Sequence, residues 1–328
     1  MAGNDYELLI SRGDYDQEPA VIEPIVWTTS RKGTPGKLEF TVVKDDLLGF
    51  NEGAQVGFKY KGEKVFLGYV FQKQRDKDQH IKVVAYDQLR YFKYKNAYVF
   101  DSMKADELLK RICNDFELKT GTIEDTKYIE PLVFFDNHTL FDMMQTMLDY
   151  TVMNTGKLYC LYDDFGEINL RDVNNMKLDL LITKDTAENF DYVSSIENTY
   201  NRVKIQAADS EKKALGQYVF SEDVANIRKW GKLQYFDNWG KDMNEAQMKA
   251  KADALLKLYN QVQRSLSVTG CLGDIRVRAG TGVFFDHSIL GDLPSGVYYK
   301  IVEEARHTFE NGHHSMDLTL MGSESFYD

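Results

Sequence analysis

The stretch over residues 242–285, DMNEAQMKAKADALLKLYNQVQRSLSVTGCLGDIRVRAGTGVFF, decides the fold, because its pattern changes from helix to strand. Asp242 lies three residues before Glu245, which is the spacing of a capping box, and a helix over residues 243–263 is therefore predicted. The apolar residues of this helix share one face: Met248, Ala252, Leu255, Leu256, Tyr259 and Val262.

Alternation of apolar and polar residues replaces the helical period from residue 264 onward. Leu266 and Val268 face one side of a predicted strand, and a glycine turn at residues 270–273 follows. Residues 275–278 alternate again and predict a second strand, which ends at the glycines of residues 280–282. One helix that leads into an antiparallel sheet predicts a β-rich domain with a helix packed on it.

The composition bounds the class of protein. With 328 residues, 43% of them apolar and 28% charged, the chain can build two or three packed domains. Its 20 Tyr and 19 Phe against 5 Pro favour strands. The sequence has no run of about eighteen apolar residues, so no membrane span is expected, and its N-terminus lacks the features of a signal peptide. Cys113, Cys160 and Cys271 indicate a reducing compartment and neither a disulfide framework nor a zinc site.

The net charge of −11 is concentrated in the middle of the chain. Residues 97–200 hold 20 Asp and Glu against 9 Lys and Arg, whereas the rest of the chain holds 31 of each sign. This shift predicts a separate acidic module. It also argues against direct nucleic-acid binding, which needs a basic surface. Residues 59–95, with 10 basic and 4 acidic side chains, are interpreted as solvated strand faces.

The order of predicted elements gives three domains. Residues 1–98 read as short strands and predict a small barrel or sandwich. Residues 99–190 predict an acidic α+β domain of two helices and a hairpin. Residues 191–328 predict a second β domain that contains the helix over residues 243–263. The predicted fold class is therefore α+β and β-rich, with two β-barrel or sandwich domains on either side of an α+β domain.

Short local signals mark the turns and helix starts. Ser102 and Thr139 are the predicted N-caps of the two helices in the middle domain. Hairpin turns are predicted at Lys61-Gly62, near residues 163–166, and at Asn311-Gly312, where the last signal is the strongest.

Two motifs suggest enzymes but have a simpler interpretation. Asp164-Phe165-Gly166 spells the metal-binding motif of protein kinases, but the sequence lacks the other kinase motifs, so a hairpin turn is predicted. Asp163 and Glu167 could form the carboxylate pair of a glycosidase. Because nothing in the sequence predicts their burial, we interpret them as solvated turn acids.

Two further groups combine ligand-like residues with an ordinary strand pattern. His313, His314 and Asp317 could bind a metal, but adjacent strand residues point to opposite faces, so a surface strand is predicted. Gly280 and Gly282 lack the lysine and the helix of a phosphate-binding loop, so they are predicted to mark the end of a strand.

The remaining candidates are apolar. Four methionines could line an adaptable groove but favour a helix core: Met143, Met144, Met147 and Met153. Trp230 and Trp239 are the candidate platform for a carbohydrate. We therefore predict no catalytic, cofactor-binding or metal-ligating residues, and no cofactor.

Four blocks of sequence resemble a known family. They are YDQLRYFKYKNAYVF with the helix SMKADELLKRICNDFEL, NHTLFDMMQTMLDYTVMNTGKLYCLYDDFGEINLRD, SSIENTYNRVKI, and RSLSVTGCLGDIRVRAGTGV. Together they are similar to the baseplate hub protein of contractile phage tails, the late-control-protein D class. The similarity is greatest to the hub of PBSX-type defective prophages and of R-type tail-like bacteriocins such as diffocin. It covers the chain from Asp87 onward, whereas earlier residues match in pattern alone.

The resemblance implies a structural role without enzymatic activity. Hubs of this class are homotrimers, and each subunit carries two tail-tube-like β domains. Three subunits then form a pseudo-sixfold ring between the sixfold tail tube and the threefold central spike. The implied partners are other copies of the chain, the tail tube protein, the central spike protein and other baseplate proteins, without a membrane anchor. The implied location is the bacterial host cytoplasm during assembly, and then the phage tail or bacteriocin particle.

Some alternatives stay open. The chain is also compatible with a cell-wall hydrolase or carbohydrate-binding component of the same particle, which would need paired carboxylates in a cleft or a tryptophan platform. Some hubs carry an additional lytic domain; because Asp328 follows soon after the last hairpin, none is expected here. The acidic residues 97–200 face either other baseplate proteins or the channel, where they would repel the phosphates of DNA.

Overall fold

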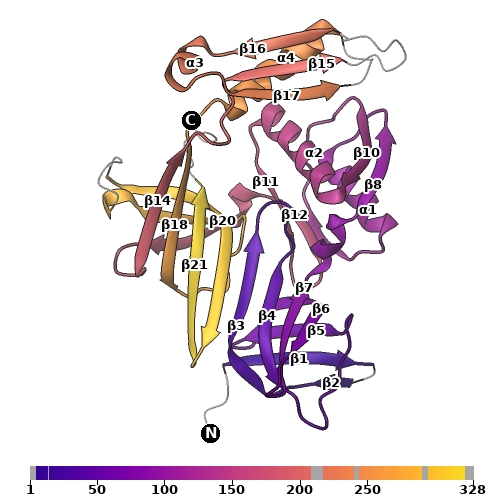
Figure 1. Cartoon of the computed structure of the whole chain (residues 1–328), viewed down its shortest axis with the longest axis vertical. Coiled ribbons are helices and arrows are strands. Elements are labelled where there is room, and N and C mark those ends of the chain that lie inside the picture. Colours follow the sequence, from indigo (N-terminus) through magenta and orange to yellow (C-terminus); the bar gives the residue numbers. More distant parts are fainter. Residues whose placement is uncertain (1–4, 14, 208–216, 240–243, 290–294, 322–328) are drawn as a thin grey trace. The chain divides into compact units, whose positions relative to one another are not determined.

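The computed structural model describes residues 5–13, 15–207, 217–239, 244–289 and 295–321 (Figure 1). Strands predominate over helices in this part of the chain, so the predicted α+β, β-rich fold class is confirmed. No helix in these ranges is long and apolar enough to cross a membrane.

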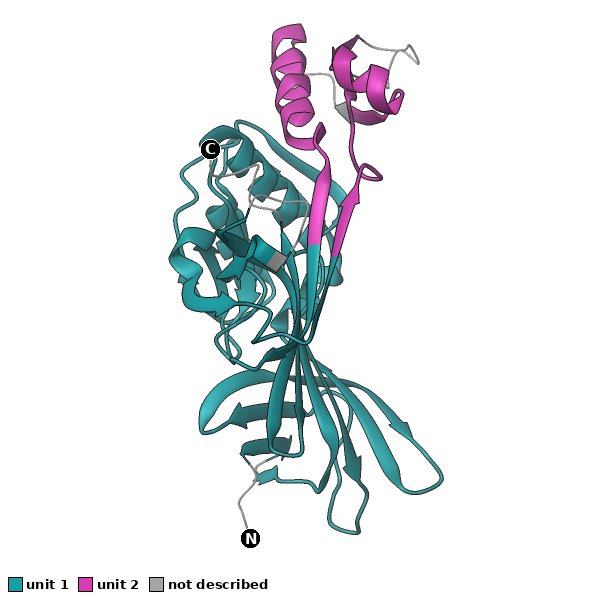
Figure 2. Cartoon of the chain, turned by 90° about the vertical axis from the view of Figure 1, so that its left-hand side faces the viewer, with its two compact units in different colours: residues 1–191, 266–328 teal, residues 192–265 magenta. Residues whose placement is uncertain are grey.

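The chain divides into two compact units (Figure 2). Unit 1 comprises residues 1–191 and 266–328, and unit 2 comprises residues 192–265, so unit 2 is an insertion within unit 1. The helix expected in the third domain belongs to unit 2, whereas the strands that follow it belong to unit 1. The division into three domains at residues 98 and 190 stays a prediction.

Strands from both ends of the chain form one large sheet in the described residues. Their order is β14-β18-β21-β20-β3-β4-β7-β6-β5-β1-β2, and β19 pairs with β20 and, in parallel, with β13. The strands are β1 (Tyr6–Arg12), β2 (Tyr15–Gln17), β3 (Val21–Ser30), β4 (Lys37–Val43), β5 (Gln55–Tyr60), β6 (Glu63–Arg75), β7 (His80–Tyr86), β13 (Lys177–Ile182), β14 (Asn189–Ser195), β18 (Gln263–Leu272), β19 (Gly282–Asp286), β20 (Val297–Glu310) and β21 (His313–Met321).

The pairing of β3 with β20 makes the sheet continuous. The two strands run antiparallel, with Ile25 opposite Phe309 and Thr29 opposite Ala305. Arg31, just after β3, adds a 2.6 Å ion pair to Glu303 in which the guanidinium is 5% exposed. Since these contacts join residues more than 270 positions apart, they tie the first segment of the chain to the last.

Alternation along the strands builds the core of this sheet. In β4, Leu38, Phe40 and Val42 are buried, as their spacing predicts, and Phe58 and Phe309 pack edge to face with ring centroids 5.0 Å apart. Burial of an aromatic or aliphatic side chain of this size stabilises the fold by about 2–3 kcal/mol.

The predicted hairpin turns are confirmed. Lys61 and Gly62 connect β5 to β6, and Asn311 and Gly312 connect β20 to β21. Both residues of each pair have positive φ, which is the geometry that two-residue hairpin turns require.

The middle of unit 1 contains two helices and two small sheets. Its elements are α1 (Ala105–Asp115), α2 (Leu140–Thr155), the pair β8 (Lys95–Phe100) and β10 (Val133–Thr139), and the sheet of β9 (Thr120–Ile123), β12 (Ile168–Asp172) and β11 (Tyr159–Asp163). The short 3-10 helices of unit 1 are η1 (Gln88–Lys93), η2 (Val173–Met176) and η3 (His287–Ile289).

One of the two predicted N-caps in this region is right. Thr139 caps α2, since its Oγ1 accepts a 3.1 Å hydrogen bond from the backbone N–H of Asp142. Ser102 does not cap α1, which was predicted to start there; Lys104 is the N-cap. The reason is that Met103 pairs with Glu130 in an antiparallel bridge, which keeps the chain extended before the helix.

Unit 2 is a three-stranded sheet with helices. It contains β15 (Arg202–Ala207), β16 (Tyr218–Glu222), β17 (Gln234–Trp239), α3 (Val224–Trp230) and α4 (Glu245–Tyr259), and β15 is the central strand. The apolar face predicted for α4 is confirmed: Met248, Ala252 and Leu255 are buried, and the helix contacts β15 and β16.

Several details of the stretch over residues 242–285 differ from the prediction. The helix predicted over residues 243–263 is shorter, since α4 spans Glu245–Tyr259, and the glycine turn predicted at residues 270–273 begins inside β18, which continues to Leu272. The capping box of α4 is formed by Asn244 and Gln247, with hydrogen bonds of 2.9 and 3.0 Å, whereas the predicted Asp242 lies outside the described residues. The strand expected over residues 275–278 is a turn, because the Asp274 carboxylate accepts from Arg276 N and the Asp274 carbonyl accepts from Val277 N. The next strand, β19, begins at Gly282.

Candidate functional site

A buried polar cluster joins three segments of unit 1. We call it the junction cluster; it consists of Asp87 and Gln88 after β7, Asp163 and Gly166 in the β11–β12 hairpin, and Arg278 before β19. Gln88 Nε2 donates to Asp163 Oδ2 at 3.2 Å and also to the carbonyl of Gly166. One amide side chain therefore connects the end of the first β segment to the hairpin of the middle region.

Both carboxyl groups of the junction cluster have a raised pKa. Asp87 is 6% exposed, and burial together with the nearby Asp163 raises its pKa well above the ordinary value. Burial raises the pKa of Asp163 to about 6, although its carboxylate accepts hydrogen bonds from Gly166 N and Gln88. Both carboxyl groups therefore keep a proton to a higher pH than an exposed aspartate does.

Arg278 closes the junction cluster from the side of the C-terminal strands. Its guanidinium donates to the carbonyl of Asp163, lies 3.2 Å from a carboxylate oxygen of Asp164, and lies 4.4 Å from the ring centroid of Tyr162. The neighbouring Ala279 N–H donates to Thr29 Oγ1 in β3 at 2.9 Å. These contacts hold the loop before β19, the β11–β12 hairpin and the large sheet together. The role of the junction cluster is therefore structural.

The kinase-like motif is a hairpin turn, as predicted. Phe165 and Gly166 are its two central residues, both with positive φ, and Asp164 and Glu167 exchange backbone hydrogen bonds of 2.7 and 3.2 Å. The interpretation of Asp163 as a solvated acid is wrong, because this side chain is 4% exposed and has hydrogen-bond donors on both oxygens. Glu167 is exposed, as predicted, so the two carboxylates do not face one cleft.

A histidine pair lies between β20, β21 and β3, with His307 buried and His314 half-buried. His307 Nε2 donates to the carbonyl of Val277, and His307 Nδ1 lies 2.9 Å from His314 Nε2, which must then be the donor. Burial lowers the pKa to about 3 for His307 and about 4 for His314. The ring of Trp27 lies against that of His307, with centroids 4.8 Å apart and an interplanar angle of 31°. The two neutral imidazoles therefore act as packing side chains.

The predicted ligand trio is not brought together as a metal site. His313 is exposed and His314 points into the core, while Asp317 accepts from Gly270 N at 3.0 Å. In the part of the chain that the structure describes, no three His, Cys, Asp or Glu residues are arranged to hold a metal ion. The sequence reasoning missed His307; its inward position in the alternation of β20, between Ala305 and Phe309, was the available signal.

The other candidates have structural positions. Met143, Met144 and Met147 are buried in the core around α1 and α2, and Met153 is half-buried, so the core interpretation is confirmed for the first three. Gly280 precedes β19 with φ of +91°, and an added Cβ would lie 2.3 Å from the sulfur of Cys160. Trp230 ends α3, and the side chain of Trp239 lies outside the described part.

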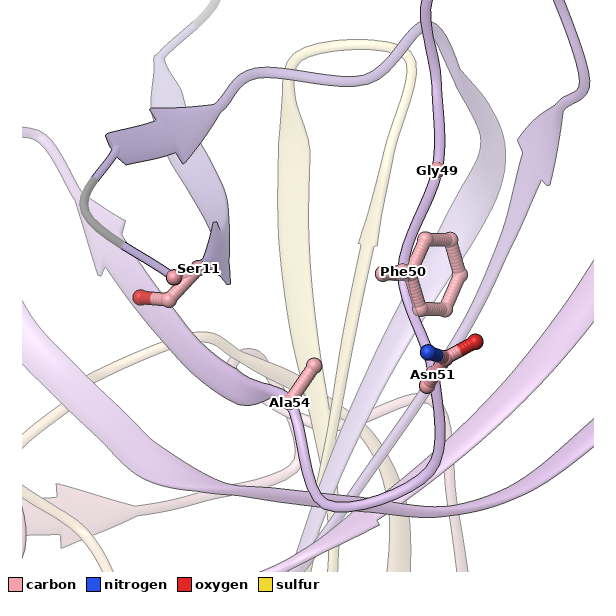
Figure 3. Close-up of a pocket in the computed structure, with 6 residues that line it drawn as sticks. Ser11, Gly49, Phe50, Asn51 and Ala54 are labelled. Atoms are coloured by element: carbon pink, nitrogen blue, oxygen red, sulfur yellow. The ribbon is translucent and has the colours of Figure 1, made fainter.

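A hollow of about 350 Å³ lies in the first β segment (Figure 3). Its lining residues are Ser11, Gly13, Gly49, Phe50, Asn51 and Ala54. None of these described residues has an ionisable side chain, so the hollow offers a ring face and amide and hydroxyl groups but no acid or base.

Comparison with known proteins identifies relatives along almost the whole chain. A family model described as YQBQ-like matches residues 25–321. The protein YqbQ of Bacillus subtilis strain 168 is 30% identical over 282 residues, which is 85% of this chain and 84% of the relative. The phage-like element PBSX protein XkdQ of the same strain is 29% identical over 311 residues, which is 92% of both chains.

Solved structures share the fold at low sequence identity. The 43 kDa tail protein of prophage MuSo2 from Shewanella oneidensis has a TM-score of 0.70 and 13% identity, covering 98% of this chain and 100% of that chain. The tail protein from Neisseria meningitidis MC58 has a TM-score of 0.68 and 12% identity, with 98% of both chains covered. The Escherichia coli c3393 protein, a component of the type VI secretion system, has a TM-score of 0.57 and 9% identity, covering 98% of this chain and 78% of that chain.

Proposed function

The chain belongs to the YQBQ-like family, and we propose that it is the structural baseplate hub of a contractile phage tail or tail-like bacteriocin. In this proposal three copies form a symmetry adaptor between the tail tube and the central spike, and the chain catalyses no reaction. Its partners are the other copies, the tube protein, the spike protein and further baseplate proteins. Assembly takes place in the bacterial host cytoplasm.

One observation carries the proposal. The likeness to the MuSo2 tail protein covers 98% of this chain and all of that chain, so it includes the large sheet, the middle helices and unit 2 together. A shared single module would be weak support, since one fold serves many functions. A shared arrangement of every module, in a chain of the same extent, is better explained by a shared position in a tail.

The names of the relatives support the same role. XkdQ is a protein of the phage-like element PBSX. The c3393 protein is described as structurally similar to the phage T4 tail proteins gp27 and gp5. These descriptions favour a structural part of a phage tail or of a tail-like machine, with which the proposed hub is compatible.

The geometry explains how such a hub would resist force. Strands from both ends of the chain lie in one sheet through the β3–β20 pairing, and the junction cluster fixes the middle region to that sheet. In our proposal the first and last strand groups supply the two tube-like domains of each subunit. A continuous hydrogen-bonded sheet between them keeps their spacing fixed, as a pseudo-sixfold ring requires.

The orientation of the acidic residues 97–200 is part of the proposal. We favour a position on surfaces that face other baseplate proteins, because several of these carboxylates, such as Glu107 and Asp125, are exposed. A trimer structure in which the same carboxylates line the channel would support the lumen position instead.

Deletion of the gene from the parent prophage tests the proposed function. After induction, electron microscopy is expected to show no complete tails with a baseplate, and a plasmid copy of the gene is expected to restore them. The purified chain is expected to give no lytic zone on bacterial cell walls. Complete tails from the deletion strain would overturn the hub, and a lytic zone would favour the cell-wall hydrolase.

A further inference from the structure

The sheet of unit 2 has two unlike faces. One face carries Val203, Ile205 and Val219, which are buried where α4 contacts β15 and β16 (Figure 1). The opposite face, which we call the aromatic face, carries cations among exposed rings. Its residues include Arg202 and Lys204 of β15, Tyr218, Phe220 and Glu222 of β16, and Phe236 of β17. Glu222 forms a 3.6 Å ion pair with Arg202, so Lys204 supplies the remaining positive charge of this set.

The cations of the aromatic face are held by the rings. Lys204 Nζ lies 5.0, 5.8 and 5.6 Å from the ring centroids of Tyr218, Phe220 and Phe236. The guanidinium carbon of Arg202 lies 3.9 Å from the centroid of Phe220. Yet Tyr218 is 57% exposed and Phe236 is 51% exposed. Large rings left open to solvent around fixed positive charges are typical of protein interaction surfaces, which are rich in Tyr, Phe and Arg.

The charge of unit 2 differs from that of the rest of the chain. Residues 192–265 hold 12 Lys and Arg against 9 Asp and Glu, which gives unit 2 a net charge of +3. Because the net charge of the whole chain is −11, unit 1 carries −14. Within unit 1, residues 97–191 hold 19 acidic and 9 basic residues, a balance of −10. A partner for the aromatic face should be acidic, and the chain itself contains a strongly acidic module.

The acidic module has a matching exposed face on the β8–β10 pair. Val99 lies opposite Phe134, and these side chains are 60% and 65% exposed. Leu132, two residues before Phe134, is 49% exposed, and the exposed Asp101 and Asp136 occupy the same alternation of the two strands. We call these five residues the acidic ladder. It combines apolar side chains with negative charge, which complements rings combined with positive charge.

We propose that the aromatic face of one copy docks on the acidic ladder of a second copy. The two faces are different patches of the same chain, so the contact is heterologous and repeats from copy to copy until a ring closes. The closure of that ring rests on the proposed function as a hub. Each face spans only two or three short strands, whereas a standard stable interface buries about 800 Å² per partner. The contact is therefore weak in the free chain and needs the other contacts of the assembled ring.

Disulfide trapping between a tagged copy and an untagged copy tests the proposal. One copy carries Gln234→Cys at the rim of the aromatic face, and the other carries Ala97→Cys at the rim of the acidic ladder; both positions are exposed. The native cysteines are buried and do not interfere. Mild oxidation of the assembled particle or of the concentrated mixture is expected to link tagged to untagged chains. A matched control replaces Ala97→Cys by Leu47→Cys, which is 84% exposed and lies outside both faces.

A charge exchange separates this contact from other causes of cross-linking. Lys204→Glu is expected to lower the yield of linked chains about tenfold, and Asp136→Lys in the second copy is expected to restore it. Circular dichroism checks that both variants fold. A yield no higher than that of the Leu47→Cys control would overturn the contact. A third variant carries both Gln234→Cys and Ala97→Cys in one chain. If its disulfide forms only within that chain, the two faces meet inside a single copy and the contact between copies is overturned.

The outcomes distinguish this contact from the proposed function. If Lys204→Glu chains still build complete tails in the deletion strain and no cross-link forms, the contact fails and the hub stands. If the deletion strain itself builds complete tails, the hub fails, whereas a tagged-to-untagged link in the concentrated chain would still support the contact.

Discussion

Replacement of Asp163 by Asn is expected to change how the stability of unit 1 depends on pH. Burial raises the pKa of Asp163 to about 6 in the folded chain, against an ordinary value of about 4. The folded state therefore holds more protons than the unfolded state between these two pH values. For a group with a raised pKa, the stabilisation is complete below the unfolded pKa and is lost as the pH rises through the folded pKa.

The expected magnitude follows from this shift. A shift of about two pKa units corresponds to about 3 kcal/mol, of which about 2 kcal/mol is lost between pH 4 and pH 7. The free energy of unfolding of the wild type should thus fall by about 2 kcal/mol relative to Asp163→Asn over this range. Because Asp87 is coupled to Asp163 and also has a raised pKa, the measured difference belongs to the pair and has the same sign.

Tryptophan fluorescence during urea unfolding can measure this difference in unit 1 alone. The chain has 3 Trp, and Trp27 is buried in the large sheet. A background of Trp230→Phe and Trp239→Phe leaves Trp27 as the reporter, and its signal is compared at pH 4 and pH 7 with and without Asp163→Asn. Contributions from His307 and His314 cancel, since both proteins contain them.

A matched control lies in the same hairpin. Glu167→Gln removes an exposed carboxylate directly before β12, and it is expected to leave the difference between pH 4 and pH 7 as it is in the wild type. If wild type and Asp163→Asn lose or gain stability in parallel from pH 4 to pH 7, burial of the carboxyl pair does not raise its pKa, and the reasoning about the junction cluster is wrong.

Three further predictions concern the core. The wild type is expected to lose about 2 kcal/mol of stability between pH 7 and pH 5 through His307, because the lowered pKa makes the folded state bind fewer protons than the unfolded state. His307→Gln should not show this loss, and urea unfolding at both pH values measures the difference. Gly280→Ala should cost about 2–4 kcal/mol by thermal unfolding, because both its positive φ and the nearby sulfur oppose a Cβ, whereas Gly62→Ala, with positive φ in open space, should cost about 1 kcal/mol. Met144→Ala should destabilise unit 1 by about 2–5 kcal/mol, and Met153→Ala by clearly less, because only Met144 is fully buried; equal losses would contradict the assigned core.

Much of the local structure could be predicted from the sequence. The hairpins at Lys61-Gly62 and Asn311-Gly312, the Thr139 cap and the buried face of α4 all depend on residues a few positions apart. Their signals are complete within a short stretch, and tertiary contacts only strengthen them. The α+β, β-rich class follows from the sum of such signals.

The candidate site was less accessible to sequence reasoning. Asp163 follows a short strand and precedes a turn, which is the usual position of a solvated acid, and nothing near it in sequence indicates Gln88 as its partner. The cap at Ser102 fails for a similar reason, because the bridge from Met103 to Glu130 comes from a distant residue. In each case the polar group or the backbone finds its partner in a residue that is distant in the sequence, and local sequence patterns carry no information about that partner.

By itself the sequence determined most of the strands and helices, which of their faces are apolar, and where the charge lies along the chain. Only the tertiary structure decided that β20 pairs with β3, that residues 192–265 form a separate unit, and that Asp87 and Asp163 are buried at one junction. The physical reason is that strand pairing and desolvation depend on which segments meet. Many partners satisfy the same alternating pattern, and the choice among them is made by the packing of the whole chain.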